Sequence, residues 1–156
     1  MRSVMITGAS RGIGLEFVRA HAADGYQVYA TCHKLSNADQ LKALQAGGQG
    51  NIDIIEMDVT NAAQVKAVAA RLQGKPLDLL INNAGSVERV FYGSGAYEGK
   101  DDPDLRNYDF DGWLDLLKTN LLGPARVCGA FVDNLAAGER PVAVNMGSTL
   151  SSIGPT

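Results

Sequence analysis

Three glycines near the amino terminus are spaced so that they could hold a phosphate-containing ligand. Gly8, Gly12 and Gly14 follow the short apolar run 4–6 and open an amphipathic segment. A strand that turns on glycines into a helix presents unpaired amides and the positive end of the helix dipole to an anion. Without a Cβ, Gly8 can make the tight turn, Gly12 can admit a pyrophosphate, and Gly14 lets helix and strand pack closely. The pattern predicts a dinucleotide site.

Polar side chains that could contribute to the same site follow two later apolar runs. Asp58 comes after residues 52–57, and the pair Asn82 and Asn83 comes after residues 77–81. Asp58 could accept a hydrogen bond from an adenine amino group, or act as a turn or cap residue. The two asparagines could bond the neighbouring backbone and hold the end of the strand in shape.

A third polar candidate lies inside a long apolar segment. Asn120 belongs to residues 111–134, which have helical periodicity and also contain Gly123 and Pro124. Because proline has no N–H, Pro124 cannot donate to the carbonyl of Asn120, four residues earlier. That carbonyl is therefore available to hold a water molecule, although the proline is equally compatible with a kinked packing helix.

Strands and helices must alternate to bring these residues together, and the apolar pattern predicts that they do. Five short apolar runs are typical of strands, at 4–6, 26–32, 52–57, 77–81 and 141–146. Four helices are expected between them: one with Ile13, Phe17, Val18 and His21 on one face, one capped by Ser36 or Asn37 and ending at Gly47, one opened by Asn61, and the segment 111–134. Such alternation predicts an α/β fold with a Rossmann-type, doubly wound parallel sheet.

The composition is that of one ordinary globular domain. With 156 residues, 46% of them hydrophobic, the chain can bury one core but is short for two, so residues 1–156 are expected to form a single domain. A net charge of −3 gives no electrostatic reason to expect nucleic acid or an anionic membrane as partner. No segment resembles a membrane span or export signal, which predicts a cytoplasmic protein. Cys32 and Cys128 are unclustered, so they are expected to be reduced thiols without a metal.

Together these segments resemble the short-chain dehydrogenase/reductase family. Its glycine spacing is present at Gly8, Gly12 and Gly14, and four further motifs follow in the family's order: Asp58 and Val59 with their neighbours, Asn82-Asn83-Ala84-Gly85, Lys118-Thr119-Asn120-Leu121-Leu122-Gly123, and Val144-Asn145-Met146-Gly147-Ser148. The sequence around Ser148 is most similar to that of the carbonyl-reductase and C-factor-like branch of the family. The matches cover the whole chain.

The resemblance implies an oxidoreductase that transfers a hydride between a nicotinamide cofactor and a small carbonyl or alcohol substrate. It assigns Ser148 to the substrate oxygen and Asn120 to a water-mediated proton relay. The cofactor site it implies consists of Gly8, Ser10, Arg11, Gly12, Ile13, Gly14, His33, Lys34, Asp58, Val59, Asn83, Ala84 and Gly85. It also implies a homo-oligomer, packed through the long helix. Residues 86–108 are expected to form either a wall of the substrate pocket or a solvated loop.

The end of the second expected strand bears on the choice of cofactor. NAD-binding versions of the fold place an acid there to bond the ribose 2′-hydroxyl. This chain has no carboxylate at that position; it has His33 and Lys34, and Arg11 lies in the glycine turn. A 2′-phosphate would be attracted to these groups, so NADP(H) is favoured, with NAD(H) still possible. The alternative is that Arg11 and Lys34 are solvated surface charges.

The family's catalytic tyrosine and lysine have no counterpart here. They are expected about a dozen residues beyond the serine, whereas Thr156 is the last residue, and no tyrosine has a lysine at the fourth following position. We therefore expect a sheet that is incomplete on its carboxy-terminal side and a chain that is catalytically inactive by itself. An uncovered apolar edge strand at 142–144 favours this over a naturally short protein. The alternatives in function are a non-catalytic NAD(P)-binding sensor and, more remotely, a scaffold.

Overall fold

The computed structural model describes residues 1–48, 50–86 and 110–148. Its centre is a five-stranded sheet in the order β3-β2-β1-β4-β5, with every neighbouring pair parallel. The strands are β1 (Ser3–Ile6), β2 (Gln27–Cys32), β3 (Asn51–Glu56), β4 (Leu79–Asn82) and β5 (Val142–Asn145). This order, with strands added outwards from β1 in both directions, is that of the Rossmann-type doubly wound sheet, so the expected fold class is confirmed.

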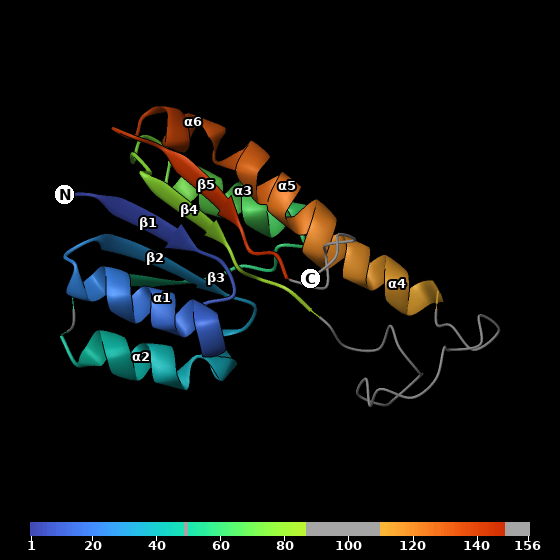
Figure 1. Cartoon of the computed structure of the whole chain (residues 1–156), viewed down its shortest axis with the longest axis horizontal. Coiled ribbons are helices and arrows are strands. Elements are labelled where there is room, and N and C mark those ends of the chain that lie inside the picture. Colours follow the sequence, from blue (N-terminus) through green and yellow to red (C-terminus); the bar gives the residue numbers. More distant parts are fainter. Residues whose placement is uncertain (49, 87–109, 149–156) are drawn as a thin grey trace, which may run out of the picture.

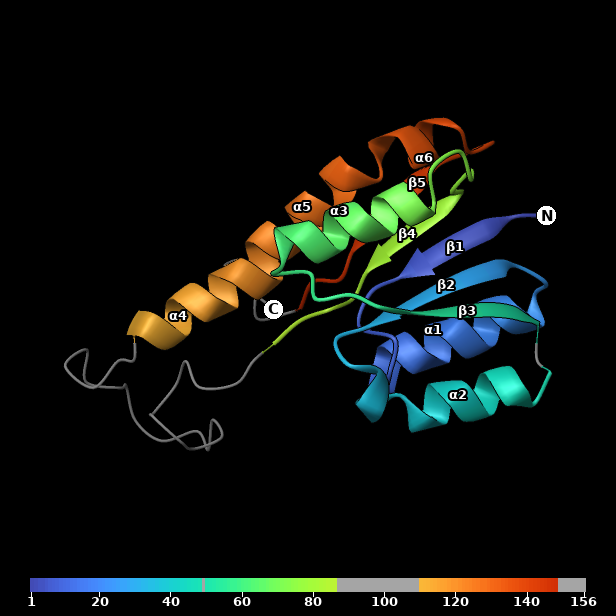
Figure 2. The same ribbon diagram turned by 180° about the vertical axis from the view of Figure 1, so that it is seen from behind.

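Helices cover both faces of the sheet (Figures 1 and 2). One face carries α1 (Gly12–Ala23) and α2 (Asp39–Ala46), and the other carries α3 (Ala62–Arg71), α5 (Gly123–Ala130) and α6 (Val132–Ala136). Each face has its own hydrophobic core. The first includes Val4, Ile6, Leu15, Val18 and Leu41, and the second includes Met5, Tyr29, Val65, Leu72 and Phe131. Alternate residues of β1 thus enter opposite cores, which explains why Val4, Met5 and Ile6 are all apolar.

Of the two predicted helix caps, that of α3 is confirmed and that of α2 is wrong. Asn61 caps α3, accepting from the backbone N–H groups of Ala63 and Gln64, as predicted. The predicted cap of α2 was wrong, because Ser36 and Asn37 lie in a short 3₁₀ turn, η1 (Leu35–Asn37), and α2 begins one residue after Ala38 without a side-chain cap. The Leu35 amide donates instead to the carboxylate of Glu56, which ties this turn to the end of β3.

The buried face of α1 also differs from the prediction. Gly14, Leu15, Val18 and Ala22 are buried, whereas Ile13 is exposed. Gly14 packs closely against the carbonyl of Gly8, so the sheet-facing stripe of α1 includes Gly14 and not Ile13. Ile13 therefore faces the ligand cavity described below instead of the core.

The segment expected as one helix over 111–134 is interrupted. It consists of α4 (Phe110–Leu117), a π-helical segment η3 (Lys118–Leu122), then α5 and α6. The π-helical segment ends two residues before Pro124, which lacks a backbone donor, so the regular α-helical pattern is interrupted next to the proline. Figure 1 shows α4 extending beyond the carboxyl ends of the strands. Within the described residues, no helix is both long enough and apolar enough to cross a membrane.

Candidate cofactor and active site

A cavity of about 780 Å³ opens at the carboxyl ends of the strands, where ligands bind in open α/β sheets. Every residue that the sequence predicted to bind the cofactor lines it, with the exception of Lys34. The lining residues are Gly8, Ser10, Arg11, Gly12, Ile13, Gly14, His33, Met57, Asp58, Val59, Thr60, Asn83, Ala84, Gly85, Ser86, Asp115, Lys118 and Thr119. Segments far apart in the sequence therefore converge on one site.

The glycine turn after β1 has the geometry of an anion cradle. Gly8 has a φ of +66°, and a Cβ there would lie 2.8 Å from the Cα of Ala84. A Cβ on Gly14 would overlap the carbonyl oxygen of Gly8, whereas one on Gly12 would meet nothing within 4 Å. The first turn of α1 has no side-chain cap and no acidic residue. The helix N-terminus is thus left open and positive toward the cavity, and it suits a phosphate.

Asn83 holds this turn against the end of β4. Its side-chain amide donates to the carbonyl oxygens of Thr7 (3.0 Å) and Gly8 (3.1 Å). In the other direction, the hydroxyl of Thr7 accepts from the backbone N–H groups of Asn83 and Ala84. The structural role predicted for Asn83 is therefore confirmed, while any direct contact with a cofactor stays a prediction.

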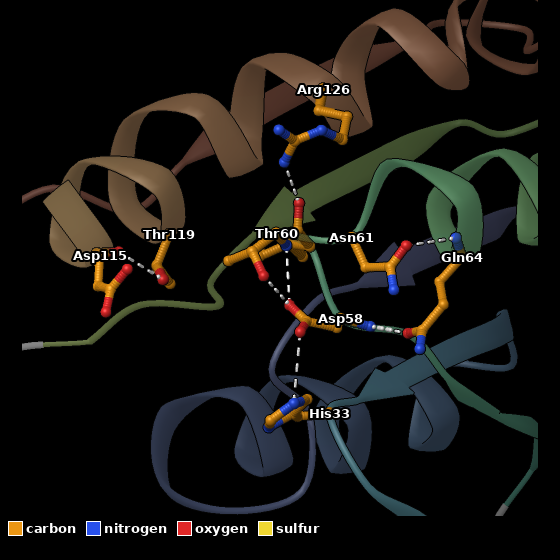
Figure 3. Close-up of polar contacts among 9 residues, drawn as sticks. His33, Asp58, Thr60, Asn61, Gln64, Asp115, Thr119 and Arg126 are labelled. Carbon is orange, nitrogen blue, oxygen red and sulfur yellow. Dashed lines mark hydrogen bonds and ion pairs between the residues drawn. The ribbon is translucent and has the colours of Figure 1, made fainter.

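Asp58 also lines the cavity, two residues after the end of β3, and Figure 3 shows its contacts. Its Oδ1 accepts from both the backbone N–H (2.8 Å) and the hydroxyl (2.7 Å) of Thr60. Its Oδ2 lies 3.4 Å from Nε2 of His33 at the end of β2. The two readings of Asp58 are thus compatible, because one oxygen organises the turn and the other faces the exposed imidazole and the cavity.

The remaining wall comes from the helix that carries Asn120, and sequence reasoning missed its contribution. Asp115, Lys118 and Thr119 line the cavity. The ammonium group of Lys118 lies 2.9 Å from the carboxylate of Asp115, and the hydroxyl of Thr119 donates to the backbone carbonyl of Asp115. Their spacing was an available signal, because Lys118 and Thr119 lie three and four positions after Asp115 and so share one helical face with it.

Asn120 itself is bound to the chain that leaves β4. Its side-chain Nδ2 donates to the carbonyl of Ser86 (2.7 Å), and its Oδ1 accepts from the Ser86 amide (2.8 Å). Asn120 also lies in the middle of the π-helical segment, where the regular pattern of backbone hydrogen bonds is altered. The side chain is therefore committed to Ser86, so any water held by Asn120 would have to use its backbone carbonyl.

Three predicted residues are not among those that line the cavity: Asn120, Ser148 and Lys34. Ser148 follows β5 and is exposed, and Lys34 is exposed at the start of η1. Asn82, buried in β4, donates to Oδ1 of Asn145 (2.9 Å) and contacts the Sγ of Cys128 at 3.3 Å, which links β4, β5 and α5. Most of the predicted loop 86–108 lies outside the described residues; only Ser86 belongs to the cavity wall.

The titratable groups near the ends of the strands give no sign of metal chemistry. Burial raises the pKa of the Cys32 thiol, and the nearby carboxylate of Glu56 raises it further. Cys32 is therefore a protonated, buried thiol under ordinary conditions. Within residues 1–48, 50–86 and 110–148, no three histidine, cysteine or acidic side chains gather where they could hold a metal ion.

Known proteins resemble this chain over its whole length. The short chain dehydrogenase family model matches residues 2–155. A (+)-neomenthol dehydrogenase from Arabidopsis thaliana is 29% identical over 97% of this chain and 55% of its own length. A short-chain dehydrogenase/reductase from Arthrinium is 34% identical over 89% of this chain and 52% of its own. The chain thus spans about half the length of the curated relatives that it matches.

Solved structures agree with this relationship. The NADPH-bound carbonyl reductase from chicken fatty liver superposes with a TM-score of 0.81 and 32% identity, covering 98% of this chain and 62% of its own. A gluconate 5-dehydrogenase from Burkholderia cenocepacia, solved with NADP and tartrate, gives a TM-score of 0.68 and 27% identity, covering 87% and 49%. With the family match over residues 2–155, these likenesses show that the chain belongs to the short-chain dehydrogenase family of oxidoreductases.

Proposed function

We propose that residues 1–156 form a single NADP(H)-binding domain of an oxidoreductase that interconverts a small carbonyl compound and its alcohol. The observation that carries this proposal is the convergence of the predicted cofactor residues on one cavity at the carboxyl ends of the strands. Two similar structures, a carbonyl reductase and a gluconate 5-dehydrogenase, are described with NADPH or NADP bound.

The residues present suit a dinucleotide phosphate. The open, uncapped N-terminus of α1 and the space above Gly12 would receive the pyrophosphate. Val59 and Asp58 would flank the adenine. Arg11 and His33 line the cavity and would attract a 2′-phosphate, and the end of β2 carries no acid to bond a 2′-hydroxyl. NADP(H) therefore fits better than NAD(H).

The bound cofactor would supply the hydride, and this chain's residues would position the reactants. Ser148 would donate a hydrogen bond to the substrate oxygen, and the backbone carbonyl of Asn120 would hold a water in a proton relay. Two observations support this role: the side chain of Asn120 is bound to Ser86, and its backbone lies in the π-helical segment. Without a Tyr-x-x-x-Lys motif, the 156-residue chain is expected to bind the cofactor but not to turn over.

The partners follow from the same reasoning. The substrate would be a small molecule, the working assembly a homo-oligomer, and the location the cytoplasm. The second candidate function is a non-catalytic NAD(P) sensor. One observation favours it: these 156 residues include the predicted cofactor-binding residues but not the Tyr-x-x-x-Lys pair.

Binding and turnover must be measured separately to test this function. Titration of the purified chain with NADPH, followed by the fluorescence of the reduced nicotinamide, should show saturable binding that is tighter than that of NADH. Gly12→Asp should abolish it, because the variant places a carboxylate where the pyrophosphate would lie. Gly129→Asp is the matched control, since Gly129 lies in α5 with nothing within 4 Å of an added Cβ. Lack of binding by the wild type would refute the proposed cofactor role.

Sequencing the gene beyond the codon for residue 156 distinguishes the enzyme from the sensor. A tyrosine and a lysine four residues apart, about a dozen residues beyond Ser148, would support the enzyme, and their absence would support the sensor. Oxidation of NADPH with a carbonyl substrate by the 156-residue chain alone, its mass verified, would contradict the expected inactivity.

A further inference from the structure

Arg126 on α5 makes a contact that neither the cofactor turn nor the proposed chemistry accounts for. Its Nη1 donates to the backbone carbonyl of Val59 at 2.5 Å (Figure 3). Arg126 is half-buried and Val59 is only 6% exposed. Within the described parts of the chain, no carboxylate forms an ion pair with Arg126. The guanidinium thus donates to a backbone carbonyl of the cavity wall. This is a charge-assisted hydrogen bond in a partly desolvated environment.

The preceding turn of the same helix contacts the side chain of Val59. A Cβ added to Gly123 would lie 2.9 Å from Cγ2 of Val59 and 3.3 Å from its Cβ. Helix α5 therefore contacts Val59 at two points. The side chain of Val59 packs against Gly123, where there is no Cβ, and the carbonyl of Val59 accepts a hydrogen bond from Arg126. These are independent contacts, one of shape and one of hydrogen bonding, on a single residue of the cavity wall.

The rest of this wall is held mainly by its own turn. The Asp58 amide donates to Oε1 of Gln64, and the Asn61 amide donates to the carbonyl of Asp58. With the bonds from Thr60 to Asp58, these contacts shape the turn but do not fix its distance from the far side of the cavity. Arg126 supplies that link, because it comes from an element 67 positions away in the sequence.

The far end of the same continuous helical stretch bears the candidate active-site residue. Asn120 lies three positions before Gly123 and six before Arg126, and it binds Ser86, which leaves β4. We propose that Arg126 is a positioning residue: through the Val59 carbonyl it holds the turn 58–60 in a fixed position relative to the helix that carries Asn120, and so orders the adenine end of the cofactor site. This inference rests on the cofactor role proposed above.

The affinities for NADPH and NADH distinguish a positioning role of Arg126 from direct attraction of the 2′-phosphate by its charge. Removing the guanidinium in Arg126→Met frees the Val59 carbonyl and the turn behind it. Both NADPH and NADH should then bind about tenfold more weakly, because both share the adenosine that this turn contacts. Attraction of the 2′-phosphate by the guanidinium would instead weaken NADPH and spare NADH. Arg126→Lys, which keeps a charged donor, should restore most of the affinity.

Two further variants guard against a trivial loss of fold. Gly123→Ala leaves the guanidinium in place but pushes on Val59, so it should weaken NADPH and NADH in parallel as well. Arg19→Met is the matched control, because Arg19 lies on the exposed surface of α1 and, among the residues that the structure describes, pairs with Glu16 alone. All titrations are made well below the melting temperature of each variant, with folding verified by circular dichroism. If Arg126→Met does not fold, Gly123→Ala and Arg126→Lys decide the question.

The outcomes separate the two proposals. A parallel loss for NADPH and NADH, with rescue by Arg126→Lys, supports positioning by Arg126. Wild-type binding that is unchanged in Arg126→Met and Gly123→Ala, even with a lower melting temperature, overturns positioning and leaves the cofactor role intact. A loss confined to NADPH also overturns it, in favour of direct attraction of the phosphate. A wild type that binds neither cofactor overturns the cofactor role and positioning with it.

Discussion

Strands β1 and β5 belong to one sheet and have the same length, yet their surroundings differ sharply. All four residues of β1 are buried, and Val4 has no exposed surface. All four residues of β5 are exposed, with Val142 at 52% and Val144 at 36%. Composition does not explain the contrast, because both strands are rich in β-branched apolar residues. Position does: β1 is central and covered on both faces, whereas β5 is an edge strand.

This difference has a counterpart in the site. The glycine turn that would hold the pyrophosphate follows β1 and is tied to β4 by Asn83, so it rests on the most buried part of the molecule. Ser148, which would meet the substrate, follows β5 and is exposed. Local stability in proteins follows burial and packing. We therefore expect the cofactor end to be rigid and the β5 end to tolerate change, and the predictions below test that contrast.

The largest effect is expected at Gly14, where the turn and helix are closest. In Gly14→Ala the new Cβ would overlap the carbonyl oxygen of Gly8 and lie 2.5 Å from Nδ2 of Asn83. Because backbone cannot move aside cheaply, NADPH affinity should fall about 100-fold or more, equivalent to about 2.8 kcal/mol. The free energy of unfolding should drop by about 1–3 kcal/mol, as in overpacked cores. Fluorescence titration and urea denaturation measure the two quantities.

A matched glycine makes this result specific. Gly129 is the last but one residue of α5, and a Cβ there meets nothing within 4 Å. Gly129→Ala should leave NADPH binding unchanged and raise the free energy of unfolding by up to about 1 kcal/mol, through helix propensity. Equal losses in the two alanine variants would show that crowding at Gly14 is not the cause.

A smaller loss is expected at Asn83, which connects the turn to β4. Asn83→Ala removes the donors to the carbonyls of Thr7 and Gly8, and NADPH affinity should fall about tenfold, with about 1–3 kcal/mol of stability lost. Asn83→Asp should be worse, since a carboxylate oxygen would face those carbonyls. Asn51→Ala serves as control, because its exposed amide contacts only Sδ of Met1. An Asn83→Ala variant that binds NADPH as tightly as the wild type would show that the hydrogen bonds of Asn83 do not support the cofactor site.

The same contrast explains what sequence reasoning could reach. The glycine turn, the Asn61 cap and the apolar strands were predictable because each is encoded by residues close together in the chain. The role of Arg126 was not, because its partner is a backbone carbonyl 67 positions earlier, and carbonyls carry no sequence signal. The cap of α2 failed for a related reason. Ser36 and Asn37 have cap chemistry, but the pairing of the Leu35 amide with Glu56 places them in a preceding turn.

The helix 111–134 shows an intermediate case. Pro124 signalled a local disturbance, and the structure has a π-helical segment over Lys118–Leu122. Periodicity alone could not divide the segment into α4, η3, α5 and α6, because a π-helical turn shifts the apolar stripe by only one residue. Trp113, Leu117 and Leu121 are exposed, whereas Phe131 is fully buried. Apolar spacing identified the helix but not which part of it is covered.

A moderate, pH-dependent effect is expected at Asp78, which connects the two regions at the opposite end of the sheet. Its carboxylate accepts from the backbone N–H groups of Glu139, before β5, and Ser3, in β1. These bonds, that of Glu139 first, hold the pKa of Asp78 below its ordinary value of 3.8. A lowered pKa in the folded state stabilises the fold above the ordinary pKa, and this contribution is lost as the pH falls through the folded pKa.

Denaturation between pH 6 and pH 2.5 tests the role of Asp78. The wild type should lose stability on acidification more steeply than Asp78→Asn, and the variant should be the less stable of the two at pH 6, because it lacks the carboxylate. Asp39→Asn is the control, since Asp39 is an exposed residue in the first turn of α2 that pairs only with Lys42. Identical acid profiles for the wild type and Asp78→Asn would mean that the carboxylate does not stabilise the junction.

The smallest effect is expected on β5, where it tests the contrast directly. Val142→Ala removes methyl groups that are already half in water, so the free energy of unfolding should change by no more than about 0.5 kcal/mol. Val28→Ala removes the same groups from β2, where the side chain is fully buried between Val4 and Ile52, and should cost about 2 kcal/mol. Urea denaturation of both variants gives the comparison. A loss at Val142 as large as at Val28 would mean that β5 is covered in solution, by another copy of the chain or by a partner, since burial is what makes a lost methyl group costly.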